Sequence, residues 1–302
     1  MTKEQFFKNL NVPTTKIDAV LDTDTYNEID DQFALAYMLR STEKINLKAI
    51  YAAPFLNEKS ASAKDGMVKS YSEILKILDL ADKSELAVNT LKGSEMYLPD
   101  EKTPVISSAA EHLIHLAMQY SAENPLYVVA IGVITNIASA LLIKPEIKEN
   151  IVVVWLGGNS TDANEFNMYQ DISAARIIFG SGVPLVQLPC GGVVESFSTT
   201  GPELEHWLIG KNKLSDYLAR NTIAEAESYA KGKPWSRIIW DVPAVAWLLN
   251  DEQRFMNDRL EYSQIPEYDR YYAIDKTRHF IKYVYHINRD AIYEDLFNKL
   301  TK

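Results

Sequence analysis

Short apolar runs alternate with segments of helical periodicity along the first two thirds of the chain. The runs have the length of strands and cover Val20–Leu21, Leu47–Ala53, Leu126–Ile131, Ile151–Leu156 and Leu185–Leu188. Helical spacing of apolar positions is found between them, at Asp31–Leu39, Lys64–Leu78, Ser108–Met118, Asn136–Leu142 and Ser173–Gly180. Strands that are apolar throughout are buried on both faces, which is typical of parallel sheets covered by helices. The pattern therefore predicts an α/β fold with a doubly wound, mostly parallel sheet and flanking helices.

The last third of the chain has a different pattern. Beyond about Gly201 it is mainly helical, and we expect a closing hairpin around Arg270–His286. No internal repeat, low-complexity tract or linker divides the chain, and 302 residues with 47% hydrophobic content can bury a large core. We therefore expect a single domain over residues 1–302 with a mainly helical C-terminal part.

Composition argues against several classes of function. The net charge is −10 and no run rich in lysine or arginine occurs, which argues against a nucleic-acid partner. The single cysteine, Cys190, excludes an internal disulfide framework and fits a reducing compartment. No apolar run reaches the length of a membrane span, and the N-terminus lacks the apolar core of a signal peptide. We expect a cytoplasmic protein that binds neither nucleic acid nor membrane.

Acidic side chains are concentrated where the first apolar run ends. They are Asp22, Asp24, Glu28, Asp30 and Asp31. Ligands of open parallel sheets bind beyond the carboxyl ends of the strands, so this loop falls at the expected ligand site. Like charges at this spacing repel one another, and a hard divalent cation such as Ca²⁺ or Mg²⁺ would compensate them through carboxylate oxygens. Capping of the next helix is the simpler interpretation for Asp30 and Asp31, but it leaves Asp22 and Asp24 unexplained.

Polar residues also follow later apolar runs or precede a later helix. The candidates are, in chain order, Asn57, Thr135, Asn136, Asn159, Glu165, Asn167 and Asp241. Taken one at a time, several have ordinary structural explanations. Asn57 fits a turn, whereas Thr135 and Asp241 fit helix caps.

Taken in order along the chain, these clusters resemble the inosine–uridine-preferring nucleoside hydrolases, a family of Ca²⁺-dependent N-ribohydrolases. The acidic loop is similar to the family's Asp-x-Asp-x-x-x-Asp-Asp motif, and Gly132–Asn136 is similar to its Gly-x-x-Thr-Asn turn. Glu165–Asn167 matches its Glu-Phe-Asn after a Gly-Gly pair, and Asp241 matches its late aspartate. The resemblance covers nearly the whole chain. Each landmark alone is weak, whereas all of them in family order are specific.

The resemblance implies a role for each matched residue. Asp24 is expected to bind Ca²⁺ and to act as the general base for a water that the ion orients. The other expected Ca²⁺ ligands are Asp31, Asp241 and the backbone carbonyl of Thr135. Residues expected to hold the ribose are Asp30, Asn57, Asn159, Glu165 and Asn167. The implied reaction is hydrolysis of the N-glycosidic bond of a ribonucleoside to free base and ribose, by a homodimer or homotetramer.

Two features depart from the family pattern. The spacer between Asp24 and the aspartate pair has five residues, Thr25–Ile29, instead of three, so the loop is expected to bulge and to bring Asn27 or Glu28 into the site. Trp240 stands where many members have a histidine that helps the base to leave. A tryptophan there resembles the purine-specific branch, and an indole cannot act as a general acid. We therefore expect Trp240 to assist catalysis by stacking on a purine, in an enzyme of purine salvage.

Two other functions fit part of the pattern. Haloacid-dehalogenase-like phosphatases also begin with a strand that ends in Asp-x-Asp-x-Thr, with the first aspartate as nucleophile, and Asp22–Thr25 is close to that motif. Those enzymes need a later lysine and a second acidic pair, and no such pair follows a later strand. The other alternative is a catalytically impaired ribose- or nucleoside-binding protein, because Trp240 replaces a catalytic histidine.

Overall fold

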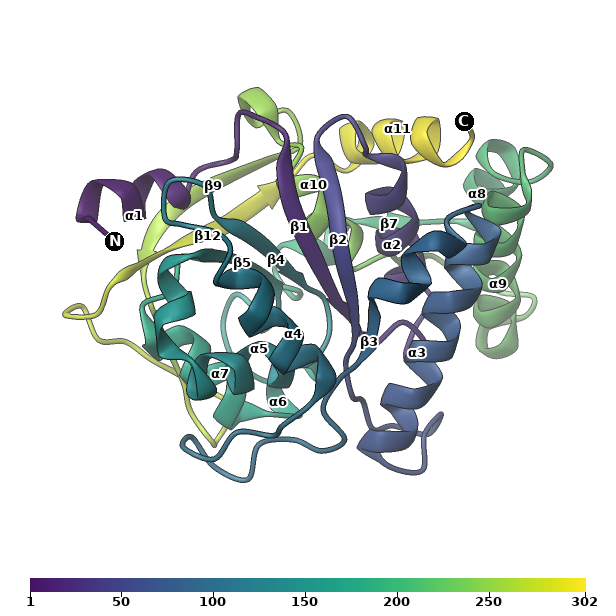
Figure 1. The fold of residues 1–302 in the computed structure, drawn as a ribbon. Helices are drawn as coiled ribbons and strands as arrows, with labels where there is room; N and C mark the ends of the chain where they lie inside the picture. The colour runs from purple at the N-terminus through teal and green to yellow at the C-terminus, as the bar shows by residue number, and fades with distance from the viewer.

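An eight-stranded sheet runs through the middle of the molecule in the computed structural model, which describes residues 1–302 (Figure 1). In spatial order its strands are β3 (Thr90–Lys92), β2 (Ile45–Ala52), β1 (Ile17–Thr23), β4 (Leu126–Ala130), β5 (Ile151–Leu156), β6 (Leu185–Leu188), β12 (Phe280–Ile287) and β9 (Met256–Tyr262). All neighbouring strands are parallel except β12 and β9, which are antiparallel. The predicted α/β fold with a mostly parallel sheet is confirmed.

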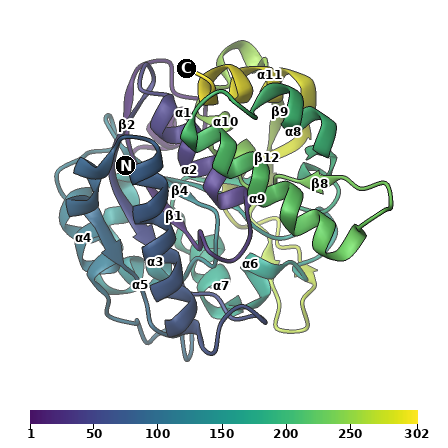
Figure 2. The same ribbon diagram turned by 90° about the vertical axis from the view of Figure 1, so that its right-hand side faces the viewer.

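Helices cover both faces of this sheet (Figure 2). One face carries α2 (Asp30–Arg40), α3 (Ala63–Leu80), α8 (Gly201–Trp207), α9 (Lys213–Ala230), α10 (Val242–Trp247) and α11 (Arg289–Leu300). The other carries α4 (Ser108–Ala117), α5 (Thr135–Ile143), α6 (Phe166–Tyr169) and α7 (Ile172–Ser181). The short helix α1 (Lys3–Asn9) lies beside β12, where Phe7 contacts Phe280.

The central strands are buried on both faces, which explains why they are apolar throughout. Successive side chains of a strand point to opposite faces, so Leu21 and Val129 enter one hydrophobic core while Val20 and Val128 enter the other. Every residue of β4 and β5 is buried. The helices predicted from apolar spacing in the first two thirds of the chain are all present, with ends that differ by one or two residues.

The prediction for the C-terminal third needs a correction. The expected hairpin over Arg270–His286 is wrong in its partners, because β12 pairs with β9, and between them lies only the short pair β10 (Ile265–Pro266) and β11 (Tyr272–Ala273). Strand β9 was not predicted, because it forms the edge of the sheet and its sequence is largely polar. Strand β3, at the opposite edge, has only three residues and was also missed.

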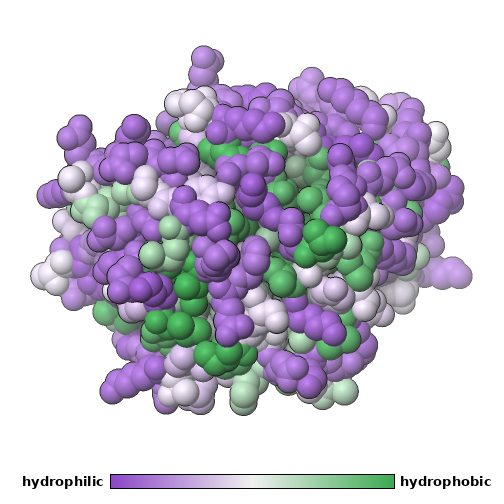
Figure 3. Space-filling view, in the orientation of Figure 1, coloured by the Kyte–Doolittle hydropathy of each residue, from purple (hydrophilic) through white to green (hydrophobic).

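The surface drawn in Figure 3 is mostly hydrophilic, with hydrophobic side chains gathered in separate patches. None of the helices combines the length and the apolar composition that a bilayer crossing requires.

A second small antiparallel pair, β7 (Ser198–Thr199) with β8 (Arg237–Ile238), leads the chain back toward the carboxyl ends of the parallel strands just before α10. Through this return, a segment more than 200 positions from the β1–α2 loop lies against it: Trp240 N–H contacts Asp30, 210 positions away.

Candidate active site

A cavity of about 290 Å³ opens at the carboxyl ends of the parallel strands. Its walls come from the β1–α2 loop, from the residues that follow β4, β5 and β6, and from the start of α10. This is the edge at which open parallel sheets bind their ligands. Residues far apart in the sequence therefore meet in one place, as the strand-end argument predicted.

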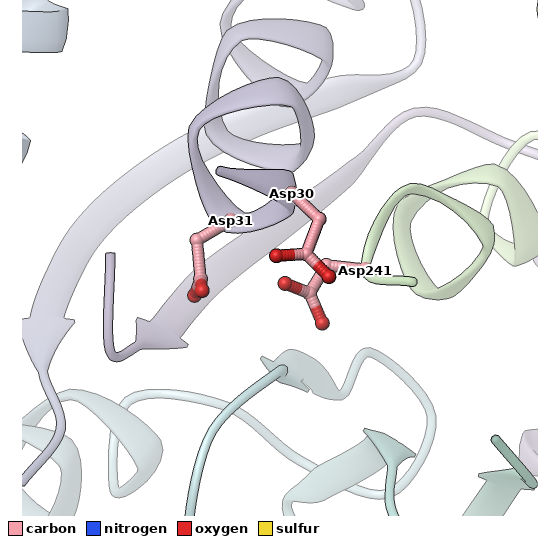
Figure 4. Close-up of side chains that lie close together, drawn as sticks. All are labelled: Asp30, Asp31 and Asp241. Carbon is pink, nitrogen blue, oxygen red and sulfur yellow. The ribbon is translucent and has the colours of Figure 1, made fainter. Parts of the chain in front are cut away.

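Three carboxylates meet on one wall of this cavity: Asp30 and Asp31 at the start of α2, and Asp241 just before α10 (Figure 4). One oxygen from each lies within 4.8 Å of the others. All three are buried, with 1–3% of their surface exposed. Two helix starts therefore direct acidic side chains at the same point.

Helix capping does not explain these aspartates. The residue at the N-cap position of α2 is Ile29, and no side chain caps this helix end. Asp241 does occupy the N-cap position of α10, yet its side chain makes no capping hydrogen bond. A carboxylate that capped a helix would accept a hydrogen bond from a backbone N–H of the first turn. The simpler interpretation weighed for these residues is therefore not realised.

Asp24 brings a fourth carboxylate to the cavity. It follows β1 directly, is 1% exposed, and neither of its side-chain oxygens has a hydrogen-bond partner. Its carboxylate lies against Gly132, where an added Cβ would come within 2.8 Å of Asp24 Oδ1. Asp30 Oδ1 is also buried without a partner. Buried anionic oxygens are normally paired, so this wall lacks a positive charge that a bound cation would provide.

The shifted pKa values of the four carboxylates agree with a cation-binding site. Burial raises the pKa of Asp24 well above its usual range, and the neighbouring Asp30 raises it further. Burial also raises the pKa of Asp30, Asp31 and Asp241, with the next largest increases from Glu28, Asp24 and Asp30 respectively. Each group thus resists ionisation in the protein alone, and a cation among them would reverse this effect.

Asp22 lies behind the cavity rather than on its wall. It is fully buried, and Asn136 Nδ2 donates to its Oδ2 at 2.8 Å. Burial raises the pKa of Asp22 to about 7. Asn136 Oδ1 in turn accepts from the backbone and hydroxyl of Ser94 at 2.7 and 2.9 Å. Asp22 and Asn136 therefore tie β1, the start of α5 and the segment after β3 together beneath the site.

The segment after β5 brings three of the residues expected to hold a ribose to the cavity lining. Asn167 Nδ2 donates to the carbonyls of Ile131 and Leu156 at 3.1 and 3.2 Å, which leaves its side-chain oxygen available. Glu165 accepts from the backbone N–H groups of Asn167 and Met168 at the start of α6, at 2.9 and 3.1 Å, and from that of Gly158 after β5, at 2.8 Å. Asn159 lines the cavity too, but both ends of its amide are engaged by protein groups.

Two expected site residues do not line the cavity. Thr135 is the first residue of α5, and its hydroxyl donates to Asp171 Oδ2 at 2.7 Å. Ile131, at the end of β4, is the residue of this segment that borders the cavity. Asn57 forms a turn through its Oδ1, which accepts from Lys59 N, and its Nδ2 donates to Asn27 Oδ1 at 2.6 Å.

The longer loop and the tryptophan both reach the site. Asn27 and Glu28 border the cavity, as the five-residue spacer suggested. Trp240 also borders it, while part of its side chain packs on the larger hydrophobic core. The Trp240 backbone N–H donates to Asp30 Oδ2 at 3.1 Å.

Sequence reasoning missed several lining residues, among them Ile131, Asn164, Phe166, Cys190 and Gly191. The last two follow β6 directly, so the rule of looking just beyond each apolar run would have found them. Cys190 is buried beside Glu165, and burial raises the pKa of its thiol. Its sulfur is therefore held as a thiol rather than a reactive thiolate.

The fold and the cavity define an α/β protein with a carboxylate-lined ligand site at the end of its sheet. The family model for the inosine-uridine preferring nucleoside hydrolases matches residues 19–289, and the chain belongs to this family. The pyrimidine-specific ribonucleoside hydrolase RihA of Salmonella typhimurium is 31% identical over 164 residues, which cover 51% of this chain and 52% of that protein. The probable uridine nucleosidase 2 of Arabidopsis thaliana is 30% identical over 135 residues, 42% of this chain and 41% of that one. The chain thus spans about half the length of the RihA protein it matches.

Solved structures share the fold over nearly the full length. The plant nucleoside hydrolase PpNRh1 superposes with a TM-score of 0.74 at 19% identity, covering 94% of this chain and 99% of the other. The purine-preferring ribonucleoside hydrolase from Gardnerella vaginalis gives a TM-score of 0.72 at 20% identity, with 94% and 98% covered. At these identities the similarity establishes the fold.

Proposed function

We propose that this protein hydrolyses the N-glycosidic bond of ribonucleosides to free base and ribose. One observation carries the proposal: at the sheet edge of a nucleoside hydrolase fold, four buried carboxylates border one cavity, and neither side-chain oxygen of Asp24 accepts a hydrogen bond from the protein. Such a site suits a cation and a polar ligand better than it suits the protein alone.

Ca²⁺ is the ion that the family resemblance implies, and the donor set fits it because all the side chains offer oxygen. Asp24, Asp31 and Asp241 would hold it, and Asp30 lies close enough to join them. The remaining proposed ligand is the carbonyl of Thr135, although Ile131 is the residue of that segment at the cavity. A bound calcium ion supplies positive charge that acidifies a water molecule and attracts sugar hydroxyls.

The side chains that line the cavity then have separate tasks. Asp24 accepts the proton of the attacking water as the oxygen bonds to C1′ and the C1′–N bond breaks. The electron pair of that bond leaves with the base, whose nitrogen takes a proton from solvent. Asn167 and Glu165, held rigidly by the start of α6, orient the ribose together with Asp30. Asn159 supports this part of the lining, whereas Asn57 acts through its hydrogen bond to Asn27.

We further propose a preference for purine nucleosides, because Trp240 borders the cavity and a purine overlaps an indole more than a pyrimidine does. The named relatives include pyrimidine-specific and purine-preferring enzymes alike. A part in purine salvage and assembly into a homodimer or homotetramer complete the proposal and rest on the family resemblance. The proposed cytoplasmic location rests on the single cysteine, which fits a reducing compartment.

The phosphatase alternative has little support in the geometry. Its nucleophile would be Asp22, which is fully buried behind the cavity and bonded to Asn136. A nucleophile must reach the reacting atom, and this carboxylate borders no open space. A binding protein without catalysis remains the second candidate, because no histidine borders the cavity.

The deciding experiment incubates the protein with a panel of purine and pyrimidine ribonucleosides and measures free ribose by a reducing-sugar assay. Parallel samples contain EDTA, or EDTA followed by excess Ca²⁺. We expect ribose release that the chelator abolishes and Ca²⁺ restores. Binding of a nucleoside without ribose release would support the binding protein instead, and phosphate release from a nucleotide without base release would support the phosphatase.

A further inference from the structure

The β1–α2 loop carries a fifth carboxylate that differs from the other four. The Glu28 side chain borders the same cavity but is 40% exposed, whereas Asp24, Asp30, Asp31 and Asp241 are each at most 3% exposed. Glu28 therefore stands at the rim, on the solvent side of the aspartates. It belongs to the spacer Thr25–Ile29 between Asp24 and the aspartate pair.

Glu28 is held in place by Arg237, which does not border the cavity. Arg237 of β8 forms an ion pair with Glu28 Oε2, and its Nε lies 3.6 Å from Glu225 Oε2. Lys59 Nζ contacts Glu225 at 3.0 Å and the carbonyl of Asn27 at 2.8 Å. The loop is thus clamped by two cations from different elements. The Glu28 carboxylate is an ordered group rather than a mobile surface side chain.

One oxygen of this carboxylate is left for a ligand. Arg237 takes Oε2, while Oε1 has no hydrogen-bond partner in the protein. An ionised carboxylate only accepts hydrogen bonds, so a ligand must offer it an N–H or O–H group. The ribose hydroxyls have proposed acceptors and donors at other places on the cavity lining, at Asp30, Glu165 and Asn167. Trp240, which is proposed to stack on the base, borders the same cavity, so the base is the group left for Glu28.

We propose that Glu28 Oε1 accepts a hydrogen bond from an N–H group on the base, so that the substrates are nucleosides whose base carries such a donor. Inosine and guanosine offer N1–H, adenosine offers its exocyclic amino group, and uridine offers N3–H. Purine riboside, 1-methylinosine and 3-methyluridine offer none. Arg237 is the positioning residue, because it touches Glu28 and does not border the cavity. This inference rests on the proposed nucleoside hydrolase function.

The test compares Glu28→Gln with the wild type on inosine and on purine riboside. Glutamine has a single acceptor oxygen, and Arg237 competes with the base for it. A hydrogen bond to a charged group contributes more than one between neutral groups. The ratio of kcat/KM for inosine to kcat/KM for purine riboside should therefore fall about 10-fold or more in the variant. If the wild type prefers pyrimidines, uridine and 3-methyluridine form the equivalent pair. Using a ratio cancels differences in leaving-group chemistry.

Glu58→Gln is the matched control, because Glu58 is exposed and lies outside the cavity but the charge change is the same. Arg237→Gln should lower the ratio in the same direction, and the double variant should lower it no further than Glu28→Gln alone. Glu28→Asp, which keeps the charge and withdraws the carboxylate, serves if glutamine impairs folding, and it should lower the ratio too.

An equal loss on both substrates would overturn the proposal and place Glu28 in cation or ribose binding. An unchanged ratio would overturn it as well. A wild-type protein that hydrolyses none of these nucleosides would instead refute the proposed function itself, so the two failures are distinguishable.

Discussion

The backbone N–H of Trp240 donates a hydrogen bond of 3.1 Å to Asp30 Oδ2, across 210 positions of sequence. This contact fixes the orientation of the Asp30 carboxylate and places Asp241, the next residue, opposite the start of α2. The same contact brings the indole that borders the cavity beside the carboxylates. The acidic centre and the indole that borders the cavity therefore meet at this tertiary contact.

The first prediction concerns Asp24→Asn. Asparagine fills the same space but cannot take the proton of a water molecule, so kcat for the best nucleoside should fall by about 10²–10⁴-fold. The fold should persist, because neither oxygen of Asp24 has a protein partner to lose. Removing one of several repelling carboxylates should leave the melting temperature in EDTA unchanged or higher.

Asp18→Asn is a suitable control, since Asp18 lies on β1, the strand that Asp24 follows, and contacts Asn46 and Tyr120 away from the cavity. Its activity should match the wild type. Hydrolysis by Asp24→Asn at a near-normal rate would show that another group is the base.

The second prediction concerns removal of the cation. A ligand that binds only the folded state adds about 2.7 kcal/mol of stability at one hundred times its Kd. Ca²⁺ should therefore raise the melting temperature by several degrees over the value in EDTA, and Asp241→Asn should lose most of this response. Thermal unfolding monitored by circular dichroism at several Ca²⁺ concentrations measures both. A melting temperature that is indifferent to Ca²⁺ in the wild type would contradict the metal site.

Much of this site could be predicted from sequence because parallel sheets impose a simple rule. The polar residues beyond each buried strand share one edge, so Asp24, Asp31, Glu165 and Asn167 converge whatever the details of the helices. The apolar runs that locate the strands are long and unambiguous, because β4 and β5 are buried on both faces.

The sequence could not show which polar groups border the cavity, because tertiary contacts determine this. Thr135 and Ile131 both follow β4 closely, and only the path of the backbone decides that Ile131 borders the cavity while Thr135 bonds Asp171. Asn57 and Asn159 have amides that the protein itself engages, through Asn27 and Gly191. No local pattern distinguishes such an occupied amide from one that is free for a ligand.

The third prediction concerns stability at acid pH. Half-buried His279 has a buried Nε2 without a partner, and burial together with the positive charges of Arg278 and Lys148 lowers its pKa from 6.5 to about 4. Between these values the unfolded chain binds a proton that the folded protein does not. This histidine therefore lowers stability progressively as the pH falls from about 6.5 toward 4.

His279→Gln removes that effect. Relative to the wild type, the variant should lose less stability between pH 7 and pH 4.5, as measured by urea unfolding midpoints at the two values. His206→Gln, at an exposed position of α8, controls for the substitution itself. Parallel pH responses of His279→Gln and the wild type would show that His279 does not govern this dependence.

The last prediction concerns Trp240, whose side chain borders the cavity and also packs on the larger core. If the indole stacks on the base, Trp240→Ala should lower kcat/KM for purine nucleosides by about 5- to 150-fold, because base–aromatic stacking contributes about 1–3 kcal/mol. Hydrolysis of p-nitrophenyl riboside should fall much less, since its leaving group needs no activation. Trp240→Phe keeps a ring for stacking and should recover part of the purine activity. An equal loss on both substrates, with a lower melting temperature, would mean that the indole serves the core and that the purine preference has another origin.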